Sequence, residues 1–265
     1  RSLSSAASDV YKRQLPYNDI SALGKAFKEY GDDIAAVIIE PIAGNMGFIE
    51  PDINFLKELR NLCTQNKTIL IFDEVMTGFR VARGGVQELL GITPDLTALG
   101  KIVGAGLPVG VYGGKAEIMN NISPDGPVYQ AGTLSGNPIA VSAGTALLKQ
   151  LGNKEIYASM EQNAKSFLNP IKEYADELKM PFSFNVRGGM FGFFFSNSLP
   201  KNFDDVQKTD IELFAKFFRK MLEKNIYLPP SAYESCFIST LHDEDKMTKA
   251  AKLAKQSLKE IKDEI

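Results

Sequence analysis

The chain has 265 residues, 44% of them hydrophobic, and its 30 basic and 32 acidic residues leave a net charge of −2. That near balance, without long blocks of like charge, argues against nucleic acid and membranes as partners and favours a small molecule. Two cysteines and a single histidine exclude a disulfide framework and a histidine-rich site, so no metal is expected. No apolar stretch is long enough to cross a bilayer. We expect the protein to be located in the reducing cytoplasm. A plastid location is the alternative, because a transit peptide could precede these residues.

The first half of the chain alternates helices with short apolar strands. Residues 1–14 are polar and serine-rich without a clear period, and we expect them to be a foreign or disordered leader. Alternation of this kind indicates an α/β fold with a mostly parallel sheet and helices on its faces. The predicted elements are helix 20–30, strand 35–39, helix 51–66, strand 68–72, helix 86–90 and strand 95–99.

The second half changes character near residue 180, where the sequence becomes aromatic and is interrupted by glycine. This change indicates a smaller α+β unit. We therefore divide the chain into residues 15–151, part of a large domain, and residues 152–265, a small C-terminal domain. The further predicted elements are strand 109–112, helix 138–151, helix 154–178, strands within 182–195, helix 210–224 and helix 243–265.

Two strands of the predicted sheet end in residues that could carry chemistry. Asp73 follows one apolar run and Lys101 follows the next, and the connection leaves room for one crossover helix. Both side chains would then emerge at the carboxyl edge, where open α/β sheets bind ligands. Pyridoxal phosphate needs a lysine for its resting Schiff base and an acid for its ring nitrogen. The alternative is that Asp73 and Glu74 cap the next element and Lys101 is a surface lysine.

Two loops could bind other parts of a ligand. Residues 130–138 combine small residues, hydroxyls and backbone amides before a helix, which suits a phosphate, although an ordinary N-cap and turn would have the same composition. Residues 44–47 follow the strand that ends at Glu40 and are expected at the same carboxyl edge. Asn45 in this loop could bind substrate or could simply tolerate a positive φ angle.

A resemblance to a known family rests on four segments: residues 71–80 (Ile-Phe-Asp-Glu-Val-Met-Thr-Gly-Phe-Arg), 99–101 (Leu-Gly-Lys), 106–110 (Gly-Leu-Pro-Val-Gly) and 129–138 (Tyr-Gln-Ala-Gly-Thr-Leu-Ser-Gly-Asn-Pro). These segments closely resemble the class III, fold-type I aminotransferases, which depend on pyridoxal phosphate. Residues 44–47, 77–80, 130–138 and 189–195 are similar to the aminomutase branch of that family. The resemblance extends from about Leu15 to the C-terminus.

The resemblance implies a role for several side chains. Lys101 would hold pyridoxal 5'-phosphate, or act beside its pyridoxamine form, and move protons, while Asp73 would pair with the ring nitrogen and Val75 would pack on the ring. Thr133 would bind the coenzyme phosphate of a neighbouring subunit, which implies a homodimer with shared active sites. Glu234 would face the active site and disfavour simple transamination; a solvated loop acid is the alternative.

The implied activity is an isomerase reaction, the conversion of glutamate 1-semialdehyde into 5-aminolevulinate for tetrapyrrole (porphyrin) biosynthesis. An ordinary class III aminotransferase and a catalytically inactive fragment are the alternatives. Members of the family carry a long N-terminal region that residues 1–14 do not resemble. We therefore expect this chain to be a C-terminal portion of such an enzyme, lacking part of the large domain.

Overall fold

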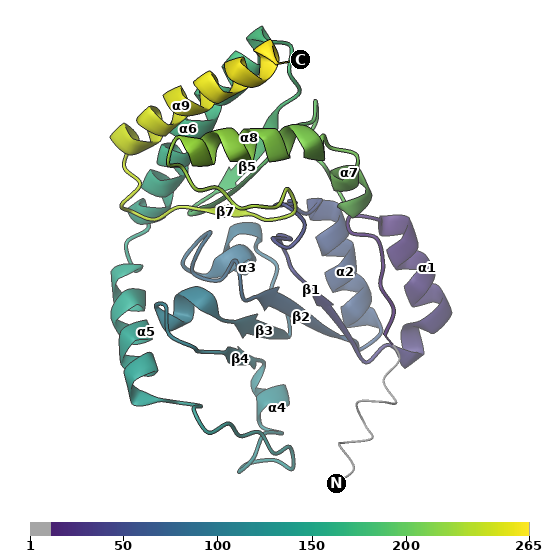
Figure 1. Ribbon diagram of the computed structural model, residues 1–265. Helices are drawn as coiled ribbons and strands as arrows, with labels where there is room; N and C mark the ends of the chain where they lie inside the picture. Colours follow the sequence, from purple (N-terminus) through teal and green to yellow (C-terminus); the bar gives the residue numbers. More distant parts are fainter. Residues whose placement is uncertain (1–11, 265) are drawn as a thin grey trace.

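The computed structural model describes residues 12–264, and residues 1–11 of the predicted leader lie outside this range. The first half of the chain builds a four-stranded sheet with the strand order β1-β2-β3-β4 (Figure 1). The first three strands are parallel and the fourth is antiparallel to its neighbour, so the predicted α/β fold with a mostly parallel sheet is confirmed. The strands are β1 (Ala36–Ile39), β2 (Ile69–Glu74), β3 (Leu96–Leu99) and β4 (Val111–Gly114).

Three helices connect the parallel strands or precede them: α1 (Ile20–Tyr30), α2 (Ile53–Gln65) and α3 (Gly85–Leu90), with a short 3₁₀ turn, η2 (Gly31–Asp33), after α1. Aspartates cap the first two helices, because Asp19 and Asp52 each accept a hydrogen bond from a backbone N–H of the first turn. The apolar sides of α1 and α2 pack on one face of the sheet. That contact buries a core that includes Phe27, Leu56 and Phe72.

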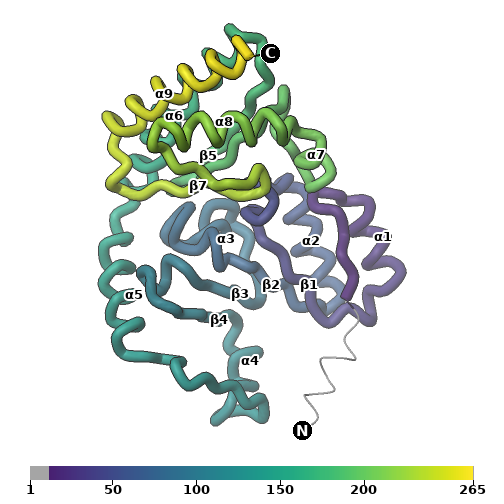
Figure 2. The backbone as a smooth tube through the Cα atoms, in the orientation of Figure 1, coloured from purple at the N-terminus to yellow at the C-terminus, as the bar shows by residue number. Residues whose placement is uncertain are grey.

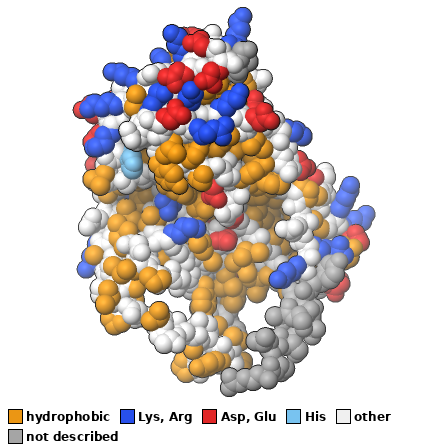
Figure 3. All heavy atoms as spheres, in the orientation of Figure 1, with side chains coloured by type: hydrophobic (Ala, Val, Ile, Leu, Met, Phe, Trp, Pro, Cys, Tyr) orange, Lys and Arg blue, Asp and Glu red, His pale blue; other side chains and the backbone are white. Residues whose placement is uncertain are grey.

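The opposite face of the sheet is largely uncovered by residues 12–264. Along β2, Leu70, Phe72 and Glu74 are buried, whereas the residues between them are only half-buried. On β1, 64% of Ile38 is exposed. Figure 3 shows hydrophobic side chains gathered over the strands of this sheet. Parallel sheets in proteins are normally covered on both faces, so this face is suited to contact with further polypeptide.

Beyond β3 the chain forms a 3₁₀ turn, η3 (Lys101–Gly104), then β4, a short helix α4 (Ala116–Met119) and the longer α5 (Pro138–Gln150). Figures 1 and 2 show α5 at one side of the sheet, where the chain leads toward the second unit. Helix α5 packs directly on η3: a Cβ built on Gly144 would lie 2.2 Å from the carbonyl oxygen of Val103. Only glycine fits at this contact, and it holds the two backbones together.

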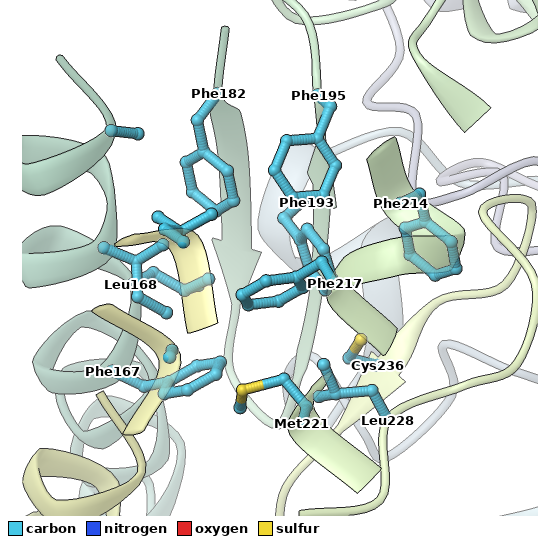
Figure 4. Close-up of a cluster of buried hydrophobic side chains, with 14 of the residues drawn as sticks. Phe167, Leu168, Phe182, Phe193, Phe195, Phe214, Phe217, Met221, Leu228 and Cys236 are labelled. Carbon is cyan, nitrogen blue, oxygen red and sulfur yellow. The ribbon is translucent and has the colours of Figure 1, made fainter. Parts of the chain in front are cut away.

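The second unit is α+β, as predicted. Its helices pack on one face of a three-stranded antiparallel sheet with the order β5-β6-β7, and phenylalanines from strands and helices fill the space between them (Figure 4). The other face of this sheet packs on the first unit, where Met190 is in one cluster with Phe48 and Phe194 is in another with Ile49. The ring of Phe193, for example, stacks on Phe214 with the ring centroids 5.6 Å apart. No helix within residues 12–264 is both long and apolar enough to span a membrane. The elements are α6 (Glu155–Glu177), β5 (Ser183–Arg187), β6 (Met190–Phe194), α7 (Phe203–Gln207), α8 (Ile211–Glu223), β7 (Cys236–Phe237) and α9 (Glu244–Asp263).

The prediction of strand 109–112 was wrong by two residues, because β4 spans Val111–Gly114. The antiparallel pairing with β3 sets this register, since Leu99 lies opposite Val111 and Leu96 lies opposite Gly114. A hydrogen bond from the backbone N–H of Lys115 to the carbonyl of Asp95 extends the same ladder. Pairing between strands, which local spacing does not encode, therefore fixes the ends of β4.

At the amino edge of this sheet, Asp95 is only 5% exposed and accepts hydrogen bonds from Arg60 Nη1 (2.8 Å) and the Leu70 N–H (2.7 Å), with Lys115 Nζ also 2.8 Å away. Burial alone would raise the pKa of this carboxyl, but the hydrogen bonds from Lys115, Leu70 and Arg60 outweigh it, and the pKa lies below its ordinary value. A carboxyl with a depressed pKa stabilises the fold above the unfolded-state pKa, and this contribution is lost as pH falls through the folded-state pKa.

We therefore expect Asp95→Asn to lower the free energy of unfolding at pH 7 by about 1–3 kcal/mol, because two cations lose their partner. The difference between the variant and the parent chain should shrink as the pH falls below the ordinary carboxyl pKa of about 4, because Asp95 of the unfolded parent chain takes up a proton there before Asp95 of the folded chain does. Urea unfolding at a series of pH values measures both. A deficit that stayed constant down to the lowest pH would show that the charge of Asp95 does not contribute.

Candidate active site

The carboxyl edge of the parallel strands holds the predicted acid and lysine. Strands β2 and β3 are parallel with α3 between them, as predicted, and Asp73 lies opposite Ala98 in their register. Strand β2 continues to Glu74, two residues beyond its predicted end, so Asp73 belongs to the strand itself. Lys101 follows Ala98 by three residues and begins η3. The fold thus places a carboxylate and an amine on adjacent strand ends.

The backbone at Lys101 is unusual, with a φ of +47° in the left-handed region that favours glycine. Non-glycine residues persist in this region where the surrounding structure holds them, and such residues concentrate at functional sites. On its N-terminal side, a Cβ built on the buried Gly100 would lie 3.1 Å from Cγ1 of Val75. Val75 therefore packs against Gly100, the residue before Lys101, and the lysine side chain is exposed.

Asp73 and Glu74 are adjacent acids with different environments. Asp73 lies on the uncovered face of the sheet, because the side chains of a strand alternate and its neighbours Phe72 and Glu74 are buried on the other face. Its Oδ1 accepts the backbone N–H of Val75 at 3.1 Å. Within residues 12–264 its Oδ2 makes no hydrogen bond, so this oxygen is available to a donor on a ligand.

Glu74 has a structural role. Its side chain is 0% exposed, and its carboxylate accepts hydrogen bonds from the Thr77 hydroxyl (2.9 Å), the Val86 N–H (2.7 Å) and both the backbone and the side-chain nitrogens of Gln87. The Val86 and Gln87 donors stand at the start of α3, so Glu74 caps that helix from the preceding strand. Gly85 makes this possible, because a Cβ at this position would lie 2.2 Å from Glu74 Oε2. The capping alternative is thus correct for Glu74.

The loop that contains Asn45 follows β1 and is tightly held. Two backbone hydrogen bonds join Ala43 and Ile49 across it. The carboxylate of Glu40 accepts the Asn45 side-chain amide (2.7 Å) and the Gly44 N–H (2.8 Å). This contact of Glu40 was not predicted from the sequence, in which Glu40 was recognised only as the end of a strand. The available signal in the sequence was an acid a few residues before a Gly-Asn turn, where its carboxylate can accept hydrogen bonds from the turn.

The structure brings Glu234 close to this loop. Glu234 is exposed in a turn after α8, and the next residue, the buried Ser235, donates its hydroxyl to the carbonyl of Gly44 at 2.9 Å. In the same turn, the carbonyl oxygen of Ala232 lies 3.1 Å from a Cβ built on Gly47. Asn45, predicted to bind substrate, and Glu234, predicted to face the active site, therefore lie in two loops that touch, although they are 189 positions apart.

Thr133 lies apart from these residues. It is exposed in the segment that leads to α5, and the described chain gives it no hydrogen bond to the other candidate residues. The apolar side chains around it are also exposed, 67% of Leu134 and 73% of Ile139. The amide of Asn137 caps α5, so the N-cap alternative holds for the end of this segment. Through α5 the segment is joined to η3, which carries Lys101.

These residues fit pyridoxal phosphate by their chemistry. An exposed lysine amine can react with the coenzyme aldehyde, and an acid with a free oxygen can accept a hydrogen bond from the ring nitrogen. Val75 offers an apolar surface between the elements that carry the two groups. The arrangement can therefore hold the ring of the coenzyme and place a base beside its reactive carbon.

Comparison with known proteins identifies the family of this chain. The aminotransferase class III family matches residues 6–246, which confirms the predicted resemblance. A glutamate-1-semialdehyde 2,1-aminomutase from Polynucleobacter asymbioticus is 48% identical over 248 residues, which are 94% of this chain and 57% of that protein. Another, from Aquifex aeolicus, is 47% identical over 93% of this chain and 58% of that protein. The chain thus spans a little over half the length of these curated relatives.

Solved structures show the same fold. An omega-transaminase from Sphaerobacter thermophilus superposes with a TM-score of 0.80 at 27% identity, covering 91% of this chain and 57% of that protein. A glutamate-1-semialdehyde aminomutase from Pseudomonas aeruginosa PAO1, solved in complex with PMP, gives a TM-score of 0.83 over 94% of this chain and 56% of that protein. Its identity is 24%, so this second likeness supports the fold alone.

Proposed function

Because this chain belongs to the class III aminotransferase family, we propose that it supplies the lysine and the acid of a pyridoxal-phosphate enzyme that moves an amino group within one substrate. The proposed reaction converts glutamate 1-semialdehyde into 5-aminolevulinate, which leads to porphyrins. Curated relatives that share nearly half of its residues carry the corresponding name, aminomutase. In this proposal the units 15–151 and 152–265 are part of a coenzyme-binding large domain and a small domain.

One observation carries the proposal: the parallel pairing of β2 and β3 puts Asp73 and Lys101 at the same sheet edge, with Val75 packed against the residue before the lysine. When bound, the coenzyme supplies an electron sink that stabilises negative charge on the substrate carbon. Asp73 would keep its ring nitrogen protonated by accepting that N–H. Lys101 would move a proton at Nζ, taking it from one carbon and returning it to the other.

The two touching loops would orient the substrate. Asn45 offers amide groups at the carboxyl edge, and Glu234 adds a negative charge on the neighbouring turn. A negative charge at this position favours a positively charged amine of the substrate over an incoming keto acid, whose carboxylate it would repel. This difference would disfavour transamination to a second substrate and favour transfer within one molecule.

We also propose a homodimer with shared active sites, in which Thr133 contacts the coenzyme phosphate of the partner subunit. The exposed apolar side chains beside Thr133, such as Leu134 and Ile139, support this proposal because a second subunit would cover them. A cytoplasmic location is consistent with two free, buried cysteines, Cys63 and Cys236. Burial raises the pKa of the Cys63 thiol to about 11, so that thiol stays protonated and unreactive.

The test is an assay of the purified chain with pyridoxamine phosphate and glutamate 1-semialdehyde. Formation of 5-aminolevulinate without an added amino donor is the expected result. Release of a keto product only when a separate amino donor and acceptor are present would instead identify an ordinary aminotransferase. If the chain neither binds the coenzyme nor turns over, the activity requires polypeptide beyond these residues, and the open sheet face gives a reason for it.

A further inference from the structure

We propose that Glu40 is a positioning residue that fixes how Asn45 presents its side chain to the bound ligand. The proposal rests on the proposed function, in which Asn45 contacts the coenzyme or the substrate. From the sequence, Glu40 was expected only to end a strand. The structure shows instead that this carboxylate is the internal partner of the Asn45 side chain.

Glu40 lies at the carboxyl edge of the sheet, beside the candidate active-site residues. In the register of β1 and β2, Ile39 lies opposite Phe72, so Glu40 is level with Asp73 on the neighbouring strand. Adjacent strands are about 4.8 Å apart, so the loop that starts at Glu40 begins beside the acid proposed to bind the ring nitrogen. The backbone of Glu40 is held in turn, because the Tyr17 hydroxyl donates to its carbonyl oxygen at 3.1 Å.

The Glu40 carboxylate determines which end of the Asn45 amide faces outward. An ionised carboxylate only accepts hydrogen bonds, so the group 2.7 Å from Glu40 Oε1 must be the amide nitrogen, Nδ2. The second oxygen, Oε2, accepts the Gly44 N–H at 2.8 Å and prevents the carboxylate from turning. In the described chain, Asn45 Oδ1 makes no hydrogen bond. Asn45 therefore presents an acceptor, which selects a ligand group that donates a hydrogen bond, such as an amine or hydroxyl.

The surrounding loop makes this orientation rigid. Gly44, which Glu40 binds through its N–H, also receives the Ser235 hydroxyl on its carbonyl oxygen. Gly47 has a φ of +89° and lies against Ala232, so the far end of the loop is held as well. A side chain on a rigid loop loses little entropy when a ligand binds, and a displacement of about 1 Å at such a position can cost about 10²-fold in rate.

Glu40→Gln is the most informative variant, because it keeps the shape of the side chain. The glutamine can accept one of the two hydrogen bonds, but its NH₂ group faces the other donor and can donate to Asn45 Oδ1 instead. We expect the Kd for pyridoxamine phosphate or the KM for substrate to rise about tenfold, since the amide is no longer held in one orientation. Asn45→Ala should give a rise of similar size.

The double variant Glu40→Gln with Asn45→Ala separates positioning from a general structural role. If Glu40 acts through Asn45, the double variant should match Asn45→Ala alone. Effects that multiply would contradict the proposal, as would an unchanged Kd and KM in Glu40→Gln. Glu50→Gln is the matched control: Glu50 also accepts from an asparagine amide, that of Asn185, but toward the second unit, and its replacement should leave both constants unchanged.

A second measurement does not depend on coenzyme or activity. In a spectrum of the ¹⁵N-labelled chain, the side-chain amide of Asn45 should show one proton shifted by its hydrogen bond to Glu40, and Glu40→Gln should remove this shift. An Asn45 amide with the same proton shifts in the parent chain and in Glu40→Gln would overturn the proposal. Because this readout needs no ligand, it tests the role of Glu40 even if the chain fails to bind the coenzyme. A failure to bind the coenzyme would count against the proposed function and not against the role of Glu40.

Discussion

Lys101→Ala is expected to abolish both the covalent attachment of pyridoxal phosphate and all measurable turnover. The fold places the Lys101 amine at the carboxyl edge beside Asp73, and alanine has no group to form the bond or move the proton. Loss of a residue that acts as both nucleophile and base typically costs more than about 10³-fold in rate. Incubation with the coenzyme, reduction with borohydride and mass analysis of a digest would measure the attachment.

Two further variants serve as controls for the Lys101→Ala result. Lys101→Arg keeps the positive charge and much of the length of the side chain, yet it should also fail to attach the coenzyme, because a guanidinium does not lose its proton at neutral pH. Lys115→Ala removes a lysine at the opposite end of the sheet, where it pairs with Asp95, and should keep the label on Lys101. A reduced label found on another lysine in the parent chain would refute the assignment of Lys101.

Glu74→Ala should lower the free energy of unfolding by about 3 kcal/mol or more, because several buried donors would lose their acceptor at once. The backbone N–H of Val86 is among these donors. Water does not easily take the place of the Glu74 carboxylate, because the Glu74 side chain is fully buried. We expect α3 to loosen first, because it would lose its cap. Urea unfolding followed by circular dichroism measures the change.

Asp73→Asn is the matched control for this prediction, because the two acids are neighbours on one strand. Asp73 accepts a single hydrogen bond on the open side of the sheet, so its replacement should cost much less stability than that of Glu74. The replacement should instead weaken coenzyme binding and turnover, because Asp73 is proposed to pair with the ring nitrogen of the coenzyme. Equal losses of stability in the two variants would contradict the division of roles between the adjacent acids.

Much of the fold could be predicted from local patterns. Helices with clear apolar periodicity and aspartate caps, such as α1 and α2, begin and end within two residues of their predicted bounds. The parallel order of β2 and β3 followed from the length of their connection. The start of β4 could not be predicted in this way, because its ends depend on pairing with β3 rather than on its own residues.

The candidate site divides in the same way. Asp73 and Lys101 could be found because each follows an apolar run, which is a local signal. The capping role of Glu74 was one of two open alternatives, since its donors on α3 are twelve or more positions away. The link between the Asn45 loop and the Glu234 turn could not be predicted at all, because the hydrogen bond from Ser235 to Gly44 joins residues 191 positions apart.

The glycine contact between α5 and η3 has a mechanical consequence. One end of α5 carries the segment around Thr133, and its middle rests on the carbonyl of Val103, two residues after Lys101, with no space for even a methyl group between them. A displacement of this segment would therefore also move η3 and the backbone of Lys101, because no flexible side chain lies between α5 and η3 at this contact. If subunits assemble at Thr133 as proposed, a shift of this segment on assembly would also change the position of the Lys101 backbone, so the quaternary contact would affect the chemistry.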